Sequence, residues 1–82
     1  MKLHAYSVYD SAAKAFLPPF FMHNNAVAIR AFAHSANDEN HQFCASPEDY
    51  TLWNIGSWTD DQGDFEIIKH EKLGTAASFL KD

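Results

Sequence analysis

The sequence lacks the features of secreted and membrane proteins. Cys44 is its only cysteine, so no disulfide can form within the chain, and a reducing compartment fits this composition best. The first residues, from Met1 to Tyr6, contain no apolar run of the roughly 7–15 residues that signal peptides need. No stretch approaches the ~18 apolar residues of a membrane span. We therefore expect a cytosolic protein that does not engage a membrane.

The sequence also lacks recognisable catalytic motifs. The three glycines, Gly56, Gly63 and Gly74, stand apart and make no phosphate-binding loop, and no serine lies in a Gly-x-Ser-x-Gly turn. Cys44 follows His41 by three residues, but a nucleophile also needs an orienting group and an oxyanion hole. We therefore expect no enzyme activity and no catalytic residue.

Groups of metal ligands are missing as well. The five histidines are scattered, and the only close pair of soft ligands is His41 with Cys44, whereas a structural zinc site takes four ligands. The acidic cluster of Asp60, Asp61 and Asp64 lacks the spacing of an EF-hand and is typical of a hairpin turn. The sequence thus predicts no metal and no cofactor.

Cations are scarce. Six Lys and Arg stand against eleven Asp and Glu, which gives a formal net charge of -5. Non-specific binding to duplex DNA depends on Lys and Arg that neutralise phosphates, so the composition argues against it. A local basic groove, or stacking of bases on aromatic rings, stays open.

Aromatic residues are abundant instead. Seven Phe, three Tyr and two Trp make up 15% of the chain, and 82 residues allow one domain with one small core, spanning residues 1–82. A monomer of this size cannot easily bury them all. We expect some to lie on an exposed strand face, where they would meet a second copy of the chain or a ligand.

The first half of the chain predicts a hairpin followed by a helix. Residues 3–9 alternate as a strand, Asp10 and Ser11 favour a turn, and the returning run of residues 14–22 is interrupted by Pro18 and Pro19, which cannot donate to a ladder. Residues 26–36 form an amphipathic helix that Asn24 or Asn25 can cap. The apolar positions of this helix are Ala26, Ile29, Phe32, Ala33 and Ala36.

The second half predicts another hairpin. After a loop over residues 37–49, residues 50–57 alternate as a strand, residues 59–64 form a turn, and the chain returns from Phe65. Leu73, Ala76, Ala77 and Leu80 step at helical spacing and predict a short C-terminal helix. The expected fold is α+β, with two β-hairpins in an antiparallel sheet flanking one amphipathic helix.

Several short motifs occur together in one order: residues 6–11, 19–22, 47–52 and 55–56, then the turn at residues 61–65 and the closing segment from Leu73 to Leu80. In this order and chain length they resemble the small nonstructural protein of gokushoviruses, the single-stranded DNA phages of the Microviridae. The resemblance implies a phage protein made in the host bacterial cytoplasm and absent from the mature virion. It also implies DNA binding, or help in switching replication toward single-stranded genome synthesis.

The resemblance brings no defined binding motif, so candidate residues come from residue chemistry. We expect single-stranded DNA to contact aromatic strand residues and nearby cations: Lys2, Tyr6, Tyr9, Lys14, Arg30, Trp53, Trp58 and Lys69. A homodimer is the expected assembly. The rival hypothesis is an acidic protein-interaction module that engages the phage initiator or a host replication factor, for which the loop at residues 37–49 is the suggested contact.

Overall fold

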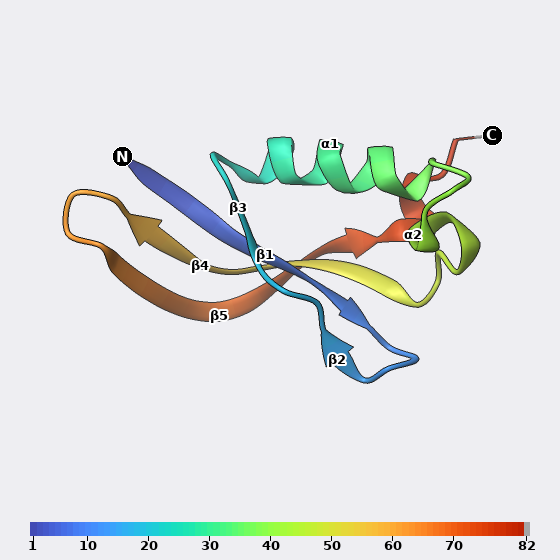
Figure 1. The fold of residues 1–82 in the computed structure, drawn as a ribbon, viewed down its shortest axis with the longest axis horizontal. Helices are drawn as coiled ribbons and strands as arrows, with labels where there is room; N and C mark the ends of the chain where they lie inside the picture. Colours follow the sequence, from blue (N-terminus) through green and yellow to red (C-terminus); the bar gives the residue numbers. More distant parts are fainter. Residues whose placement is uncertain (82) are drawn as a thin grey trace.

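The computed structural model describes residues 1–81 and shows an antiparallel five-stranded sheet with one long helix along one face (Figure 1). The strand order is β2-β1-β4-β5, and β3 also pairs with β1. The predicted α+β fold is confirmed. The elements are β1 (Lys2–Asp10), β2 (Ala15–Phe16), β3 (Phe20–Met22), α1 (Asn25–Ala36), α2 (Gln42–Ala45), β4 (Tyr50–Thr59), β5 (Asp64–Thr75) and the 3-10 helix η1 (Ala76–Phe79).

The return strand of the first hairpin is interrupted at the two prolines, as the sequence predicts. β2 pairs with β1 at Tyr9 and Asp10, and β3 pairs with β1 again at residues 4–6. Between them lie Pro18 and Pro19, which have no backbone N–H to give to a ladder. Leu17 still donates its N–H to the Val8 carbonyl at 2.8 Å, so the break begins directly after it.

Helix α1 is capped by an asparagine at each end, Asn24 and Asn37. The Asn24 side chain accepts from the Val27 N–H at 2.9 Å, which confirms the predicted N-cap. The buried residues of α1 are Ala28, Phe32 and Ala36, and Ala26 is exposed. The buried stripe is therefore rotated from the predicted one. The many alanines of α1 make more than one face look apolar in the sequence.

The core lies between α1 and the face of the sheet that α1 covers. Tyr6, Val8 and Leu52 supply its floor, and Phe32 and Phe43 close it from above. Tyr6 and Leu52 are the largest fully buried side chains among the described residues. This placement fixes which face of β1 and β4 is internal.

Two predicted segments differ from the structure. The loop at residues 37–49 contains the short helix α2, whose N-terminus is capped by His41 Nδ1 accepting from the Phe43 N–H at 3.0 Å. The C-terminal helix expected from Leu73 onward is wrong for its first turn, because β5 continues to Thr75 opposite Thr51. Only the single 3-10 turn η1 follows. Pairing with β4 outweighs the helical spacing of a segment that contains Gly74.

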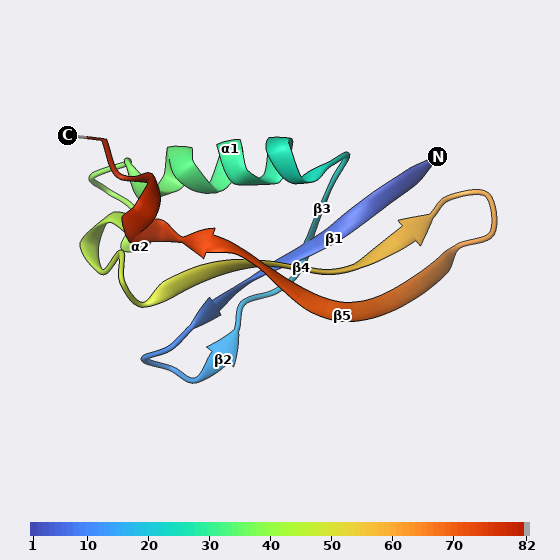
Figure 2. The same cartoon turned by 180° about the vertical axis from the view of Figure 1, so that it is seen from behind.

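The second hairpin is longer than predicted and is bent by bulges. Asn54 pairs with Glu71 while Gly56 pairs with Ile67, so Ile55 faces three residues of β5. Beyond this point the sheet projects past the start of α1 (Figure 2). We call this projection the arm: residues 2–4, 56–59 and 64–67. Its turn contains Gly63 at φ +66°, the left-handed residue that the sequence predicts there.

Candidate nucleic-acid interface

The sheet has one face that no helix covers, which we call the outer face. Along β1, Tyr6 and Val8 belong to the core under α1, so Ala5, Ser7 and Tyr9 point the other way. Register carries this assignment to the neighbouring strands, because directly paired residues share a face. In both cartoon views α1 lies on one side of the sheet only (Figures 1 and 2).

One aromatic cluster lies on the outer face beside the β1–β2 turn. Phe16 is its centre and is 44% exposed. Its ring centroid lies 4.9 Å from that of Tyr9, 6.5 Å from Trp53 and 5.7 Å from His70. The Trp53 indole N–H donates to Thr51 Oγ1 at 2.8 Å, so this ring is held against its own strand. Four strands thus contribute one ring each.

A second aromatic cluster lies on the outer side of the arm. Phe21 stands 6.4 Å from Trp58 and 6.2 Å from Phe65 between ring centroids. Phe21 and Phe65 are about half exposed, and Ile67 beside them is 77% exposed. These are large apolar side chains facing water, which is unusual for a solvated hairpin.

Small residues underlie both clusters. Ala5 and Ser7 point outward but are buried, and they pair with Phe21 and Trp53 on the neighbouring strands. At Gly56 an added Cβ would lie 2.4 Å from the Glu66 carbonyl oxygen and 3.2 Å from the Phe65 ring. The rings therefore form a layer on top of a floor of small residues rather than a set of isolated side chains.

The charges of the strands are divided between the two faces. The strand carboxylates of the described residues pair with residues on the α1 side: Asp10 with Tyr50, Asp64 with Thr59, Glu66 with Ser57 and Glu71 with Asn54. Glu71 also accepts from the Asn25 amide of α1 at 3.3 Å. On the outer face, Lys72 pairs directly with Trp53. A chain with a net charge of -5 thus keeps strand carboxylates away from this surface.

The structure brings three of the four predicted aromatic residues to the outer face. Tyr9 and Trp53 belong to the first cluster and Trp58 to the second. Tyr6 is different: it is fully buried and its hydroxyl donates to Asn25 Oδ1 at 2.8 Å, so no base can stack on it. Burial, together with the nearby charge of Glu71, raises the pKa of Tyr6 and keeps this hydroxyl protonated.

The predicted cations do not form one patch. Lys2 pairs with Thr59 on the α1 side of the arm, Lys14 lies in the β1–β2 turn, and Arg30 is exposed on α1. Lys69 is exposed within the β5 bulge. The aromatic and cationic residues of this surface that the sequence analysis missed are Phe16, Phe21, Phe65, His70 and Lys72. Their grouping depends on a register that crosses two bulges, and no local sequence signal reveals it.

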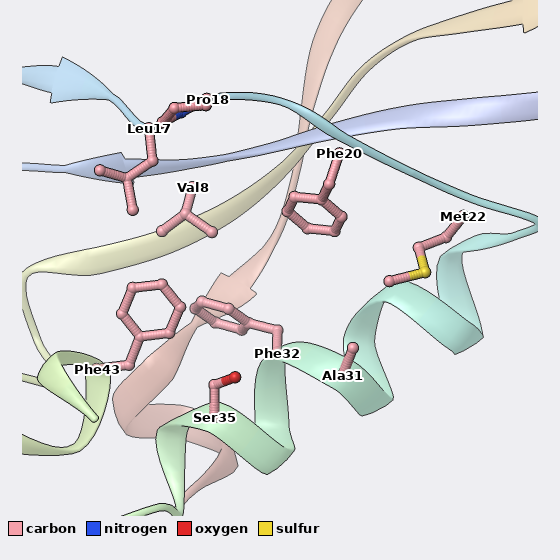
Figure 3. Close-up of a pocket in the computed structure, with 9 residues that line it drawn as sticks. All are labelled: Val8, Leu17, Pro18, Phe20, Met22, Ala31, Phe32, Ser35 and Phe43. Atoms are coloured by element: carbon pink, nitrogen blue, oxygen red, sulfur yellow. The ribbon is translucent and has the colours of Figure 1, made fainter. Parts of the chain in front are cut away.

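A second concave feature lies on the other side of the sheet. A cavity of about 280 Å³ opens between α1 and residues 17–22, the interrupted return of the first hairpin. Its lining is almost wholly apolar (Figure 3). Leu17 and Phe20 face Phe32 and Ala31 across it, with Phe43 at one end. The irregular chain around Pro18 leaves this part of the core open to solvent.

Across residues 1–81 no three His, Cys, Asp or Glu side chains are grouped so that they could share a metal ion. Within the same residues no helix has both the length and the apolar character to cross a membrane.

Comparison with known proteins places the chain in a family. The family described as Phage ORF5 protein matches residues 3–79, which is nearly the whole sequence. No curated protein and no solved structure matches it. The match covers far more than half of the chain, and the chain therefore belongs to the Phage ORF5 family.

Proposed function

We propose that this member of the Phage ORF5 family is a non-enzymatic phage accessory protein that binds single-stranded DNA on its outer face and acts in genome replication. The family supports the coarser statement, a phage accessory protein. The finer one agrees with the likeness to the gokushovirus nonstructural protein. In this role the protein favours the switch to single-stranded genome synthesis, works in the host bacterial cytoplasm and stays out of the mature virion.

The single observation that carries the DNA-binding proposal is the outer face itself. Its first cluster presents partly exposed aromatic rings from four strands, and the strand carboxylates point away from the face. Base–aromatic stacking contributes about 1–3 kcal/mol per base in single-strand binders and tolerates any base sequence. Removing carboxylates from the surface also avoids repulsion of the phosphates.

The same surface favours single strands over duplexes. In a duplex the base faces are stacked on each other and are closed to protein rings, so recognition depends on phosphates and groove edges. The outer face offers Lys72 and the imidazole of His70 for phosphates, which is too few for strong duplex binding.

Titration of a fluorescently labelled oligo-dT with the protein tests this proposal, at low and at moderate salt. We expect saturable binding at micromolar protein, with a blunt duplex of equal length binding much more weakly. Absence of binding at micromolar protein even at low salt would contradict the proposal. Equal affinity for the duplex would contradict the stacking argument.

The apolar cavity beside Leu17 and Phe32 favours a second candidate function. A groove of this kind suits an apolar side chain of a protein partner, such as the phage initiator or a host replication factor. Pulldown from host lysate separates the two functions. A stoichiometric protein partner that is lost in Leu17→Asp, without nucleic-acid retention, would favour the protein-interaction module.

We also propose that the protein acts as a homodimer, joined through the arm. The outer side of the arm is apolar, with Phe21, Phe65 and Ile67 exposed, while its α1 side carries polar residues such as Ser57 and Glu66. All residues of β5 from 64 to 72 are exposed, and β5 ends the strand order, so its outer edge is open. An open edge beside an apolar patch suits pairing with a second copy.

A further inference from the structure

A hollow on the solvent side of α1 gathers basic side chains from two distant parts of the chain. It measures about 260 Å³ and is lined by Arg30, Ala33, His34, Asn37 and Lys81. None of these residues belongs to the sheet, and none carries a carboxylate side chain. We propose that this hollow is a binding site for a phosphate group, supplied either by free phosphate monoesters or by the phosphodiester backbone of a nucleic acid.

Asn37 builds the site by fixing the end of the chain on the helix. Its Nδ2 donates to the carbonyls of Ala33 at 2.8 Å and Phe79 at 2.9 Å, and its Oδ1 accepts from the Lys81 N–H at 2.7 Å. The backbone of Lys81 is thereby held beside the last turn of α1. Lys81 is brought to the hollow by three hydrogen bonds of one side chain, not by chance proximity.

Within residues 1–81, no carboxylate stands beside the cations of the hollow. Arg30 and His34 lie one turn apart on the same helix face. The only salt bridge within residues 1–81 joins the amino terminus to Asp60, far from this site in sequence. No acidic residue among residues 1–81 lines the hollow. A bound anion would place negative charge between these cations.

Helix-end electrostatics explain only part of the cluster. Cations near a helix C-terminus interact favourably with its partial negative charge, and this accounts for His34 in the last turn. Arg30 lies before that turn, and Lys81 comes from outside the helix. Their convergence on Ala33, whose side chain ends at Cβ, leaves room for a tetrahedral group between them.

The chemistry of the lining fits phosphate. A guanidinium presents paired N–H donors that match two phosphate oxygens, and a lysine ammonium adds a mobile point charge. The site is on α1, on the other side of the sheet from the outer face. Phosphate binding at this site is therefore independent of single-strand binding on the outer face. The negative end of the helix opposes the anion, and we therefore expect saturation at millimolar rather than micromolar phosphate.

The test is a titration of the whole protein with inorganic phosphate, followed by amide NMR shifts at constant ionic strength with chloride as the reference anion. We expect saturable shifts at the amides of Ala33, His34 and Asn37. Arg30→Gln and Lys81→Gln should each weaken phosphate binding by about five- to tenfold, the loss expected for one charge-assisted contact. Lys14→Gln is the matched control, because it removes one exposed charge in the β1–β2 turn.

The outcomes separate clearly. Linear, unsaturated shifts, or an equal loss in Lys14→Gln, would overturn the site, since either result means diffuse attraction to net charge. Two further titrations distinguish the sources of phosphate. Competition with inorganic phosphate by thymidine monophosphate alone would assign the site to monoesters, and competition by a short oligo-dT in a Trp53→Ala background would assign it to the nucleic-acid backbone.

Discussion

Lys72 of β5 stands directly opposite Trp53 of β4 on the outer face. The indole N–H of Trp53 is already bonded to Thr51, so its polar edge is not free to bind a ligand. An ammonium group beside a ring face is a suitable arrangement for one nucleotide, with the base on the ring and the phosphate on the cation. The pair makes the single-strand proposal specific enough to test residue by residue.

Replacing Trp53 by alanine should weaken oligo-dT binding. The loss of one stacking platform corresponds to about 1–3 kcal/mol, or roughly 5- to 150-fold in Kd. Trp53→Phe should retain most of the affinity because a ring remains. His23→Ala, which removes an exposed ring before α1, should leave the Kd unchanged. Fluorescence anisotropy measures all three, and equal losses in the alanine variants at Trp53 and His23 would contradict a local platform.

Lys72→Gln should alter the salt dependence of binding more than binding at a single salt concentration. One phosphate contact contributes about 0.7 to the slope of log K against log salt for single strands, so the slope should fall by about that amount. Lys2→Gln removes a charge on the α1 side of the arm and serves as the control. A slope that falls equally in both variants would show that net charge, rather than the position of Lys72, decides it.

Tyr6→Phe should lower stability without affecting DNA binding. It removes the buried hydroxyl that donates to Asn25, while Asn25 Oδ1 keeps its bond from Asn54 Nδ2 at 3.1 Å. The expected loss is about 0.5–1.5 kcal/mol in the free energy of unfolding, measured by urea denaturation. Tyr9→Phe is the matched change on the outer face. A drop in oligonucleotide affinity in folded Tyr6→Phe would contradict the assignment of Tyr6 to the core.

Stability in acid should depend on Asp60. Its hydrogen bond to the amino terminus, and the positive charge there, lower the pKa of the Asp60 carboxyl. Because the pKa of Asp60 is lower in the folded state than in the unfolded state, where it is about 3.9, the ionised carboxylate stabilises the fold above that pH. This contribution disappears as the pH falls through the folded-state pKa. The stability difference between wild type and Asp60→Asn should therefore be present at about pH 6 and shrink below about pH 4. Thermal melts of both proteins, with Asp61→Asn as the control, measure it.

Ile67→Asp should dissociate the proposed dimer. Ile67 is 77% exposed on the arm, so the substitution places a charge in the interface without disturbing the core. We expect wild type to sediment above 9.3 kDa at micromolar concentration and Ile67→Asp to sediment at the monomer mass. Glu66→Gln, on the other side of β5, should leave the mass unchanged. A wild-type mass of 9.3 kDa at all concentrations would remove the dimer.

The sequence predicts elements well where local chemistry decides them. The N-cap at Asn24, the break at Pro18 and Pro19, and the left-handed Gly63 all follow from backbone geometry that few residues can satisfy. These features do not depend on what packs against them. The fold class therefore follows from the sequence.

The candidate surface could be predicted only in part. Alternation shows that Tyr6 and Tyr9 lie on opposite faces, but it does not reveal which face α1 covers, so Tyr6 was wrongly expected to be available. The extra residues at Ile55 and in β5 shift the register, and the position of Lys72 beside Trp53 follows only from tertiary pairing. Likewise, the strand pairing of Thr75 overrides the helical spacing after Leu73.

The two prolines of the first hairpin also limit how many molecules can join. A sheet can grow by adding copies of the chain only if it has an open strand edge on both sides. At one edge of the sheet, Pro18 and Pro19 separate two short strands of two and three residues, so no further strand can pair along that edge. The opposite edge strand is the long β5. A molecule with one open edge pairs once and then stops, so the proposed dimer would be a closed pair instead of a fibre.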